Sequence, residues 1–248
     1  MHPPLSRRRL LTGAGRGAVA VVLLAACGDP AGPEEQEAPD GGTATSAPDS
    51  SGEASAAWTR VDLGFVAAYV LVRGREAAVV DTGTPGSADA IGESLRGAGS
   101  SWSAVRHVLL THYHPDHAGG VPDVMQRAEA ATGYAGEADL PRIDGPRPMK
   151  AAADGAEIFG LQVVATPGHT AGHISLFDPA TGVLVAGDAL TNNGDLAGSN
   201  PQYTADDGQA RESLRKLAAL PVRTIYVGHG DPVEDGAADA LRRLSQGG

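Results

Sequence analysis

Short apolar runs broken by Gly- and Pro-marked turns follow one another along residues 58–248. Two of these runs, Phe65–Val72 and Ala77–Val80, are joined through Arg73-Gly74-Arg75, which predicts a hairpin. The pattern predicts further strands over Arg106–Leu110, Leu161–Ala165, Ile174–Phe177, Val183–Ala186 and Arg223–Val227, and helices over Ser87–Gly97, Ala118–Ala130, Ala205–Leu220 with Thr204 as N-cap, and Ala237–Leu244. Hairpins mixed with strand–helix units predict a layered α/β domain whose sheets are covered by helices.

Histidines and aspartates stand where several of these runs end. The densest group, Thr111-His112-Tyr113-His114-Pro115-Asp116-His117, directly follows an apolar run. His169, Asp188 and His229 each follow a glycine at the end of another run. Strand ends that open into loops are where α/β scaffolds usually carry their chemistry. Imidazole and carboxylate are ligands that zinc binds well, so the sequence predicts a metal site.

The spacing inside the dense group predicts two ions rather than one. Side chains alternate in an extended segment, so His112 and His114 lie on the same side and, with a third imidazole, form an open three-histidine site. Asp116 and His117 follow a Pro-assisted turn and can face a second ion. Asp188 is an isolated carboxylate suited to bridge two ions about 3.5–4 Å apart.

Residues 1–26 have the form of an export signal, with a basic start and a short apolar run. The paired arginines before two leucines resemble a twin-arginine signal, and Leu24-Ala25-Ala26-Cys27-Gly28 resembles a bacterial lipobox. Cys27 is the only cysteine of the chain. We expect Cys27 to be lipidated and to anchor the exported protein to the outer face of the cell membrane.

Residues 27–57 and 58–248 differ sharply in composition. The first segment is rich in Pro, Gly, Ala, Ser and Thr and holds seven acidic residues and no basic one, which predicts a disordered tether. The second is long enough for one domain with a substantial core. The whole chain has a formal net charge of −11. An acidic domain argues against a nucleic-acid partner, which usually requires a basic surface.

The ordered motifs resemble the metallo-β-lactamase superfamily. The resemblance rests on His112-x-His114-x-Asp116-His117, Gly168-His169-Thr170-Ala171-Gly172-His173, Gly187-Asp188 and Gly228-His229, and it begins at Val79-Val80-Asp81-Thr82-Gly83. It implies a four-layer αββα sandwich with the metals at the open edge of its two sheets. It further implies that the first metal is held by His112, His114 and His169, the second by Asp116, His117 and His229, and that Asp188 bridges them.

Two further residues of the motifs have supporting roles by the same resemblance. Asp81 is expected to orient metal ligands through hydrogen bonds, as ligating histidines commonly need. His173 matches a histidine that is not usually a ligand. The resemblance implies two zinc ions, with iron or manganese as alternatives, and a metal-bridged hydroxide that attacks a carbonyl, with Asp116 and Asp188 as catalytic residues.

The resemblance does not identify the substrate, because members of one superfamily act on different substrates. The best-known β-lactamases of the superfamily have a cysteine where this chain has Asp188, whereas an aspartate there is typical of glyoxalase II and the lactonases. Acyl-homoserine lactonases carry a tyrosine at the position of Thr191. The resemblance therefore predicts a hydrolase of a small ester, thioester, lactone or lactam. A mononuclear-iron persulfide dioxygenase and a non-catalytic metal-binding lipoprotein are the alternatives.

Two segments offer candidates for substrate contact. Pro141–Lys150 carries Arg142, Arg147 and Lys150 and is either one wall of the cleft, where it would attract an anion, or a solvated surface loop. Asn192, Asn193 and Tyr203 follow Asp188 and could donate hydrogen bonds to a substrate.

Replacing Cys27 by Ala tests the predicted anchor. Without a thiol to lipidate, the Cys27→Ala protein should be released from membranes or remain unprocessed. Cell fractionation and mass spectrometry of the N-terminus measure both outcomes. A wild-type chain that is fully soluble and keeps an unmodified N-terminus upstream of Cys27 would refute the lipoprotein prediction.

Overall fold

The computed structural model describes residues 56–247. The predicted export signal, the lipidation site at Cys27 and the tether up to residue 55 lie outside the described residues. Within residues 56–247, no helix is both long enough and apolar enough to span a membrane.

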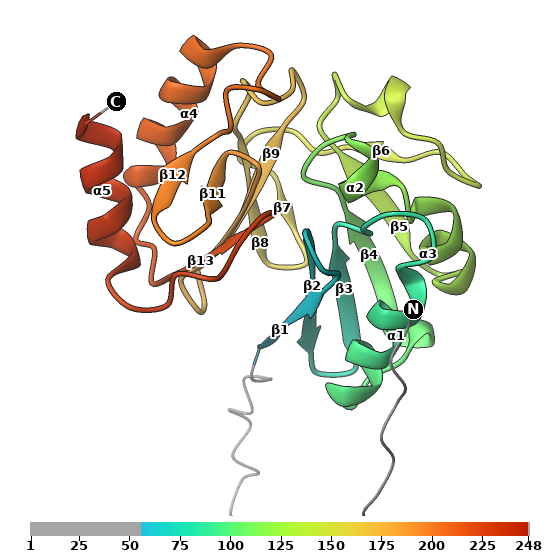
Figure 1. Ribbon diagram of the computed structural model, residues 1–248. Helices are drawn as coiled ribbons and strands as arrows, with labels where there is room; N and C mark the ends of the chain where they lie inside the picture. The colour runs from blue at the N-terminus through green and yellow to red at the C-terminus, as the bar shows by residue number, and fades with distance from the viewer. Residues whose placement is uncertain (1–55, 248) are drawn as a thin grey trace, which may run out of the picture. The chain divides into compact units, whose positions relative to one another are not determined.

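Two sheets form the centre of the domain (Figure 1). The first has the order β1-β2-β3-β4-β5-β6 and the second the order β13-β10-β9-β8-β7, while β11 and β12 pair as a separate hairpin. The strands are β1 Ala57–Asp62, β2 Ala67–Arg73, β3 Glu76–Val80, β4 Val105–Leu109, β5 Thr132–Ala135, β6 Lys150–Ala151, β7 Glu157–Ile158, β8 Leu161–Ala165, β9 Ile174–Asp178, β10 Val183–Gly187, β11 Leu190–Asn192, β12 Leu196–Gly198 and β13 Thr224–Val227.

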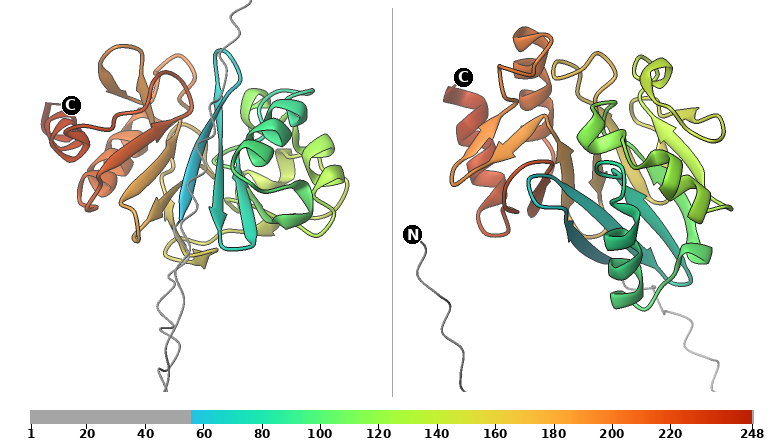
Figure 2. Two further views of the ribbon diagram at one scale, coloured as in Figure 1. Left: turned by 90° about the horizontal axis from the view of Figure 1, so that it is seen from below. Right: turned by 45° about the vertical axis from the view of Figure 1, so that its right-hand side comes forward.

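Helices cover the outer face of each sheet, so the domain has the predicted αββα layers (Figure 2). The helices are α1 Ala88–Gly97, α2 Pro115–Ala118, α3 Val121–Arg127, α4 Asp207–Ala218 and α5 Ala237–Gly247, with short 3-10 turns at Trp102–Ala104 and Leu140–Arg142. Helices α1 and α3 pack on the first sheet, and α4 and α5 on the second.

Strict alternation along the strands divides the core into three layers. In β2, Val70 packs toward α1 and α3, whereas its neighbour Tyr69 packs between the two sheets. In β9, Leu176 lies between the sheets and Phe177 lies against α4 and α5. All four side chains are at most 3% exposed. Because successive side chains of a strand point to opposite faces, two-sided apolar strands require cover on both sides, which the four layers provide.

Most predicted elements are confirmed with shifts of one or two residues at their ends. The predicted helix over Ala118–Ala130 is wrong in its bounds: the chain forms α2 from Pro115 and, after a break at Gly119–Gly120, α3. Proline starts the helix early because it favours the first helical turn, where its missing N–H costs nothing. The break lies where Gly120 passes so close to Thr82 that a Cβ atom would collide with the Thr82 carbonyl oxygen.

The predicted N-cap of α4 is also wrong. Asp206, rather than Thr204, accepts a hydrogen bond from the backbone N–H of Gln209 at 2.9 Å. The Thr204 hydroxyl instead donates to the carbonyl oxygen of Asn200 at 2.7 Å. A carboxylate satisfies the free N–H groups of the first turn and is favoured there by the helix dipole.

Asp178, at the end of β9, joins the two sheets on the side of the domain away from the dense histidine group. Its buried carboxylate accepts hydrogen bonds from Trp58 Nε1 at 2.9 Å, Arg73 Nη2 at 2.6 Å and Thr181 Oγ1 at 2.8 Å. Burial alone would raise the pKa of Asp178, but these three donors hold it below its ordinary value. The carboxylate therefore favours the folded state as long as it is ionised.

The Asp178→Asn variant should lose stability because a neutral amide cannot accept from all three donors. We expect a loss of about 1–3 kcal/mol near pH 7, measured by urea unfolding with the metal content held constant. Because the folded pKa is the lower one, the contribution of Asp178 is present above its unfolded pKa and is lost as pH falls through its folded pKa. The difference from wild type should therefore shrink below about pH 4.

Asp239→Asn is the matched control, since Asp239 is an exposed α5 residue that pairs with Arg242. A surface pair of this kind contributes little. Equal effects of the two substitutions would contradict the role given to Asp178.

Candidate metal centre

The carboxyl ends of five strands meet at one edge of the two sheets. In the first sheet, β3 runs parallel to β4. In the second sheet, β8 and β10 both pair antiparallel with β9, and β13 pairs parallel with β10. Strands β8, β10 and β13 therefore run in the same direction. Main-chain hydrogen bonds from Ala67 N to Gly228 O and from Ile174 N to Thr111 O, both 2.9 Å, join the sheets at this edge.

All seven residues predicted as metal ligands lie at this edge. Their donor atoms form three groups whose members lie within 4.8 Å of one another: His112, His114 and His169; His112, His117 and Asp188; and Asp116, His117 and His229. His112 and His114 follow β4, Asp116 and His117 lie in α2, His169 lies between β8 and β9, and Asp188 and His229 follow β10 and β13. The structure thus brings together side chains separated by up to 117 residues of chain.

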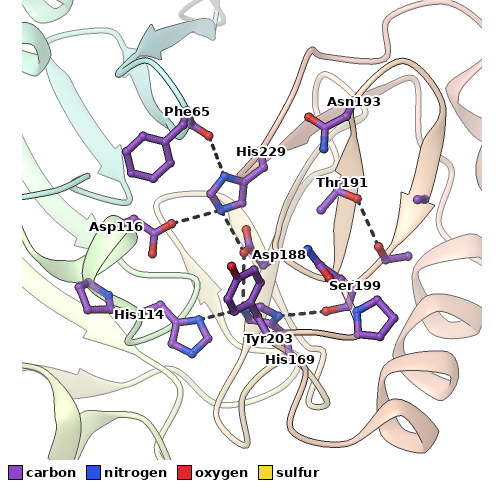
Figure 3. A pocket seen from close by; sticks show the side chains of 15 residues that line it. Phe65, His114, Asp116, His169, Asp188, Thr191, Asn193, Ser199, Tyr203 and His229 are labelled. Atoms are coloured by element: carbon purple, nitrogen blue, oxygen red, sulfur yellow. Dashed lines mark hydrogen bonds and ion pairs between the residues drawn. The ribbon is translucent and has the colours of Figure 1, made fainter.

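The three imidazoles of the first group point their inner nitrogens at one another, and Figure 3 shows two of them, His114 and His169. His114 Nδ1 lies 3.0 Å from His112 Nε2 and 2.9 Å from His169 Nε2. His112 is fully buried, while His114 borders a cavity that opens to solvent. The group therefore has one closed side and one open side, as a catalytic zinc site requires.

The second group is built around two carboxylates. His229 Nε2 lies 3.2 Å from Asp116 Oδ2 and 3.2 Å from Asp188 Oδ2. Asp188 also approaches His117 Nε2 at 3.2 Å and His169 Nε2 at 3.4 Å. Asp188 therefore stands between the two groups, which is the position that a bridging ligand needs.

Two of the imidazoles have their protons fixed by outer partners that can only accept. His117 Nδ1 lies 2.8 Å from Asp81 Oδ2, and His229 Nδ1 lies 2.7 Å from the carbonyl oxygen of Phe65. A carboxylate and a carbonyl both require an N–H from the ring, which places the proton on Nδ1. In the neutral ring, Nε2 then carries its lone pair into the site.

A hydroxyl fixes His112 in the same way. The Thr111 hydroxyl donates to Asp81 Oδ2 at 2.8 Å, so its oxygen is left to accept from His112 Nδ1 at 3.1 Å. Asp81 thereby sets the orientation of both His112 and His117, which is the position expected of an outer partner. Asp81 has a left-handed backbone, with φ of 58°. Asp tolerates this conformation better than most residues.

His169 is fixed by a chain of two hydroxyls that sequence reasoning did not find. Thr204 Oγ1 donates to Asn200 O, so Ser199 Oγ donates to Thr204 Oγ1 at 2.7 Å. Ser199 Oγ then accepts from His169 Nδ1 at 3.0 Å. The proton of His169 therefore lies on Nδ1 and its Nε2 lone pair faces the site. Nothing in the spacing of Ser199 and Thr204 indicates this contact, because the loop after β12 decides it.

These proton positions leave an excess of acceptors at the centre. Four Nε2 lone pairs and two carboxylates converge, and none of the four neutral rings that carry these lone pairs aims a donor at the centre. Asp188 Oδ1 is buried and has no hydrogen-bond partner among the described residues. Acceptors at such distances repel unless a cation lies between them. The residues present therefore fit divalent metal ions with nitrogen and oxygen ligands.

The pKa values of the histidines also indicate that the centre needs positive charge. Burial lowers the pKa of His169 to about 4, whereas hydrogen bonds to Asp116 and Asp188 raise that of His229 to about 10. Burial also opposes charge on His117, yet the carboxylates of Asp188 and Asp81 raise its pKa well above the ordinary value. Without metal, protons on His117 and His229 thus balance the two carboxylates.

His173 supports Asp188 and belongs to none of the three groups. Its Nε2 accepts a hydrogen bond from the backbone N–H of Asp188 at 3.1 Å, and its Nδ1 lies 2.8 Å from Thr166 Oγ1. Burial lowers its pKa to about 3, so the ring is neutral and can accept. Gly228 leaves room for the Asp188 carboxylate, because a Cβ atom at position 228 would collide with Asp188 Oδ1.

A cavity of about 940 Å³ opens over the centre. It is lined by Phe65, His114, Pro115, Asp116, His169, Asp188, Thr191, Asn193, Ala197, Gly198, Ser199, Asn200, Pro201, Tyr203 and His229. The predicted contacts Asn193 and Tyr203 are among them. Asn192 is not, and its side chain donates to Asp231 O. Phe65 was not predicted as a lining residue, because the run Phe65–Val72 was interpreted as a strand, whereas β2 begins only at Ala67.

Of the two alternatives for Pro141–Lys150, the surface loop is confirmed and the cleft wall is wrong, because the segment does not line this cavity. Arg147 donates to the carbonyl oxygens of Met125 and Ala128, at 2.7 and 2.6 Å, and so caps the end of α3. Arg142 stacks over the ring of Tyr113, with its guanidinium carbon 3.9 Å from the ring centroid. Lys150 is in β6. The segment is thus a structural loop with an exposed surface.

The hydroxyl chain behind His169 gives a direct test of the proton assignment. In Ser199→Ala, His169 Nδ1 loses its partner and the ring loses its fixed orientation. We expect affinity for one ion to fall roughly 10- to 100-fold, measured by competition with a chromophoric chelator. Ser103→Ala, at an exposed serine paired with Ser101, is the control and should bind metal like wild type. Unchanged affinity in Ser199→Ala would contradict the assignment.

Comparisons with known proteins agree with this geometry. The model of the metallo-β-lactamase superfamily matches residues 61–229. The chain is 36% identical to metallo-β-lactamase domain-containing protein 1 of Xenopus laevis over 171 residues, 65% of this chain and 70% of that protein. It is 38% identical to a hydroxyacylglutathione hydrolase of Alkalilimnicola ehrlichii over 157 residues, 62% of this chain and 57% of that enzyme. The chain thus spans less than two thirds of the hydrolase.

Solved structures show the same fold. A metallo-β-lactamase family protein of Thermus thermophilus is 26% identical, with a TM-score of 0.62 over 77% of this chain and 78% of that one. TTHA1623 in a di-iron-bound form is 26% identical, with a TM-score of 0.63 over 75% of this chain and 98% of that one. The family model covers well over half of the chain and includes every candidate ligand. The chain therefore belongs to the metallo-β-lactamase superfamily.

Proposed function

We propose that the protein is a metal-dependent hydrolase that cleaves a carbonyl compound of small size with two zinc ions. The observation that carries this proposal is the set of converging acceptors, with fixed imidazole protons, at the floor of an open cavity. Ester, thioester, lactone and lactam are the candidate bonds. The similarity to a protein named hydroxyacylglutathione hydrolase supports the thioester class.

Two bound zinc ions would polarise the carbonyl and lower the pKa of water to near neutrality. One ion would be held by His112, His114 and His169. The other would be held by Asp116, His117 and His229, and Asp188 would bind both ions. The side chain of Asp116 is 25% exposed, so it also reaches the cavity. There its carboxylate can accept a hydrogen bond from the attacking water and fix its direction of attack.

The lining of the cavity supports direct attack by water. The hydroxyls of Ser199 and Thr191 line it, but Ser199 belongs to the hydroxyl chain of His169, and Thr191 lies within 3.4 Å of the carbonyl oxygen of Gly198. His169 Nδ1, which lies beside Ser199, carries its own proton and so cannot take one from the serine, and among the described residues Thr191 contacts only a carbonyl oxygen. Neither of these two hydroxyls is therefore placed to form a covalent acyl intermediate.

We further propose that the protein acts outside the cytoplasm as a lipoprotein, anchored through Cys27. The basic start, the apolar run and the lipobox-like residues 24–28 support this proposal. The acidic tether of residues 27–57 would hold the domain away from the membrane surface.

The Asp188→Ala variant tests the proposed metal centre. Removing the shared carboxylate leaves two cations to repel across a small gap, so at least one ion should be lost. We expect activity to fall roughly 1000-fold or more. Metal is measured by elemental analysis of protein from its native host, and activity on a panel of 4-nitrophenyl acetate, lactoyl thioesters, a lactone and a lactam.

Two results would contradict the proposal. Asp188→Ala with both ions and near-normal turnover would remove the bridging role. One iron per wild-type chain, with oxygen consumption and no hydrolysis across the panel, would replace the hydrolase by a dioxygenase. Hydrolysis in ¹⁸O-labelled water should place the label directly in the product acid, and a trapped acyl adduct would exclude direct attack.

A further inference from the structure

The wall of the cavity opposite the metal ligands is uncharged. It consists of the β11–β12 hairpin and the loop that follows, which contribute Thr191, Asn193 and residues 197–201 and 203 (Figure 3). Among the described residues that line the cavity, none is Lys or Arg, and the only acids are the candidate ligands Asp116 and Asp188. A substrate therefore meets the metal centre on one side and amide, hydroxyl and apolar groups on the other.

The chain segments that supply the lining residues carry acidic side chains and no lysine or arginine. Residues 62–66, 113–118, 188–209 and 228–236 contain no Lys or Arg. Asp62, Asp195, Asp206 and Asp231 lie within three residues of lining residues, and all four are exposed. Exposed charges of one sign set up a field at a cleft that repels ligands of the same sign.

The arginines near these segments do not reverse that field. Arg60 donates to Gly230 O at 3.2 Å and lies 3.5 Å from Asp62, which neutralises it. The guanidinium of Arg142 lies flat on the ring of Tyr113, outside the cavity lining. Arg211, in α4, attracts Asp206 and does not line the cavity either, so none of the three offers a free cation to a carboxylate bound there.

Two aromatic side chains supply the apolar part of the lining. Phe65, in the β1–β2 turn, is 66% exposed, and Tyr203, in the loop after β12, is 59% exposed. They are the exposed large hydrophobic side chains of the described residues, and both line this cavity. Phe65 is stacked on the ring of His229, with centroids 6.2 Å apart. Exposed apolar groups gathered at one cavity indicate a ligand with an apolar part.

We propose that this site selects an uncharged substrate with an apolar body and disfavours an anionic one. This inference rests on the proposed hydrolase function and adds the class of substrate. The metal centre polarises the carbonyl of either kind of substrate, so the discrimination comes from the outer wall. A carboxylate there would lose water without gaining a cationic partner, and burying a charge without a partner is costly.

A matched pair of thioesters tests the proposal. S-lactoylglutathione and S-lactoyl-N-acetylcysteamine share the acyl group and the scissile bond, but the first leaving thiol carries a net negative charge and the second none. With the metal-loaded protein, kcat/KM should be at least about 10-fold higher for the neutral thioester at low salt. The difference should shrink as salt screens the acidic side chains beside the cavity lining, over a Debye length of about 8 Å at physiological ionic strength.

Two charge variants locate the effect in the wall. Asn193 is exposed and lines the cavity, so Asn193→Lys should raise kcat/KM for the glutathione thioester relative to the neutral one. Gln246→Lys makes the same charge change on an exposed position of α5 and should leave the ratio unchanged. Tyr203→Ala should raise KM for the neutral thioester more than it lowers kcat, because it removes contact with the apolar part of the substrate.

The outcomes separate this proposal from the hydrolase function. Equal activity on both thioesters, or a preference for the anionic one, would overturn the uncharged substrate and leave the hydrolase in place. If esters are cleaved but thioesters are not, methyl 4-acetoxybenzoate and 4-acetoxybenzoate give the same comparison. Hydrolysis of no member of the panel by metal-loaded protein would overturn the hydrolase function and this proposal with it.

Discussion

The central constraint in this structure is electrostatic: acceptor atoms are packed against acceptor atoms at a buried edge of two sheets. Asp188 illustrates it, because one carboxylate faces His117, His169 and His229 at 3.2–3.4 Å and keeps a buried oxygen with no hydrogen-bond partner among the described residues. Such an arrangement is stable only with positive charge inside it. Protons on His117 and His229 can supply that charge, and divalent ions supply more of it with better geometry.

The atoms behind the ligands connect this centre to the rest of the fold. Asp81 holds His117 directly and His112 through Thr111, Phe65 O holds His229, and Ser199 holds His169. These partners come from the ends of strands in the first sheet and from the loop after β12. Because Phe65 and Ser199 also line the cavity, the same short segments orient the ligands and face the substrate. A change in either segment should therefore affect metal binding and substrate selection together.

The sequence predicted the elements that carry a strong pattern. Two-sided apolar strands such as β9 and β10 and the period of α4 are visible in the chain itself, because burial on both faces or on one face imposes that pattern. Short strands such as β6 and β7, of two residues each, carry too few positions to show one. The break between α2 and α3 was missed because it depends on the contact of Gly120 with Thr82, which is distant in sequence.

The sequence by itself also determined the kind of chemistry. The residue types and spacing of His112, His114, Asp116 and His117 indicate metal ligands whatever the fold, since imidazole and carboxylate at such density have few other uses. Only the tertiary structure decided which lone pairs face the centre and what surrounds the substrate. The hydroxyls of Ser199 and Thr204, the place of Phe65 and the distance of Arg142 from the cavity follow from loops that the two sheets bring together. A linear pattern does not encode such contacts, because they depend on how strand ends far apart in the chain meet in space.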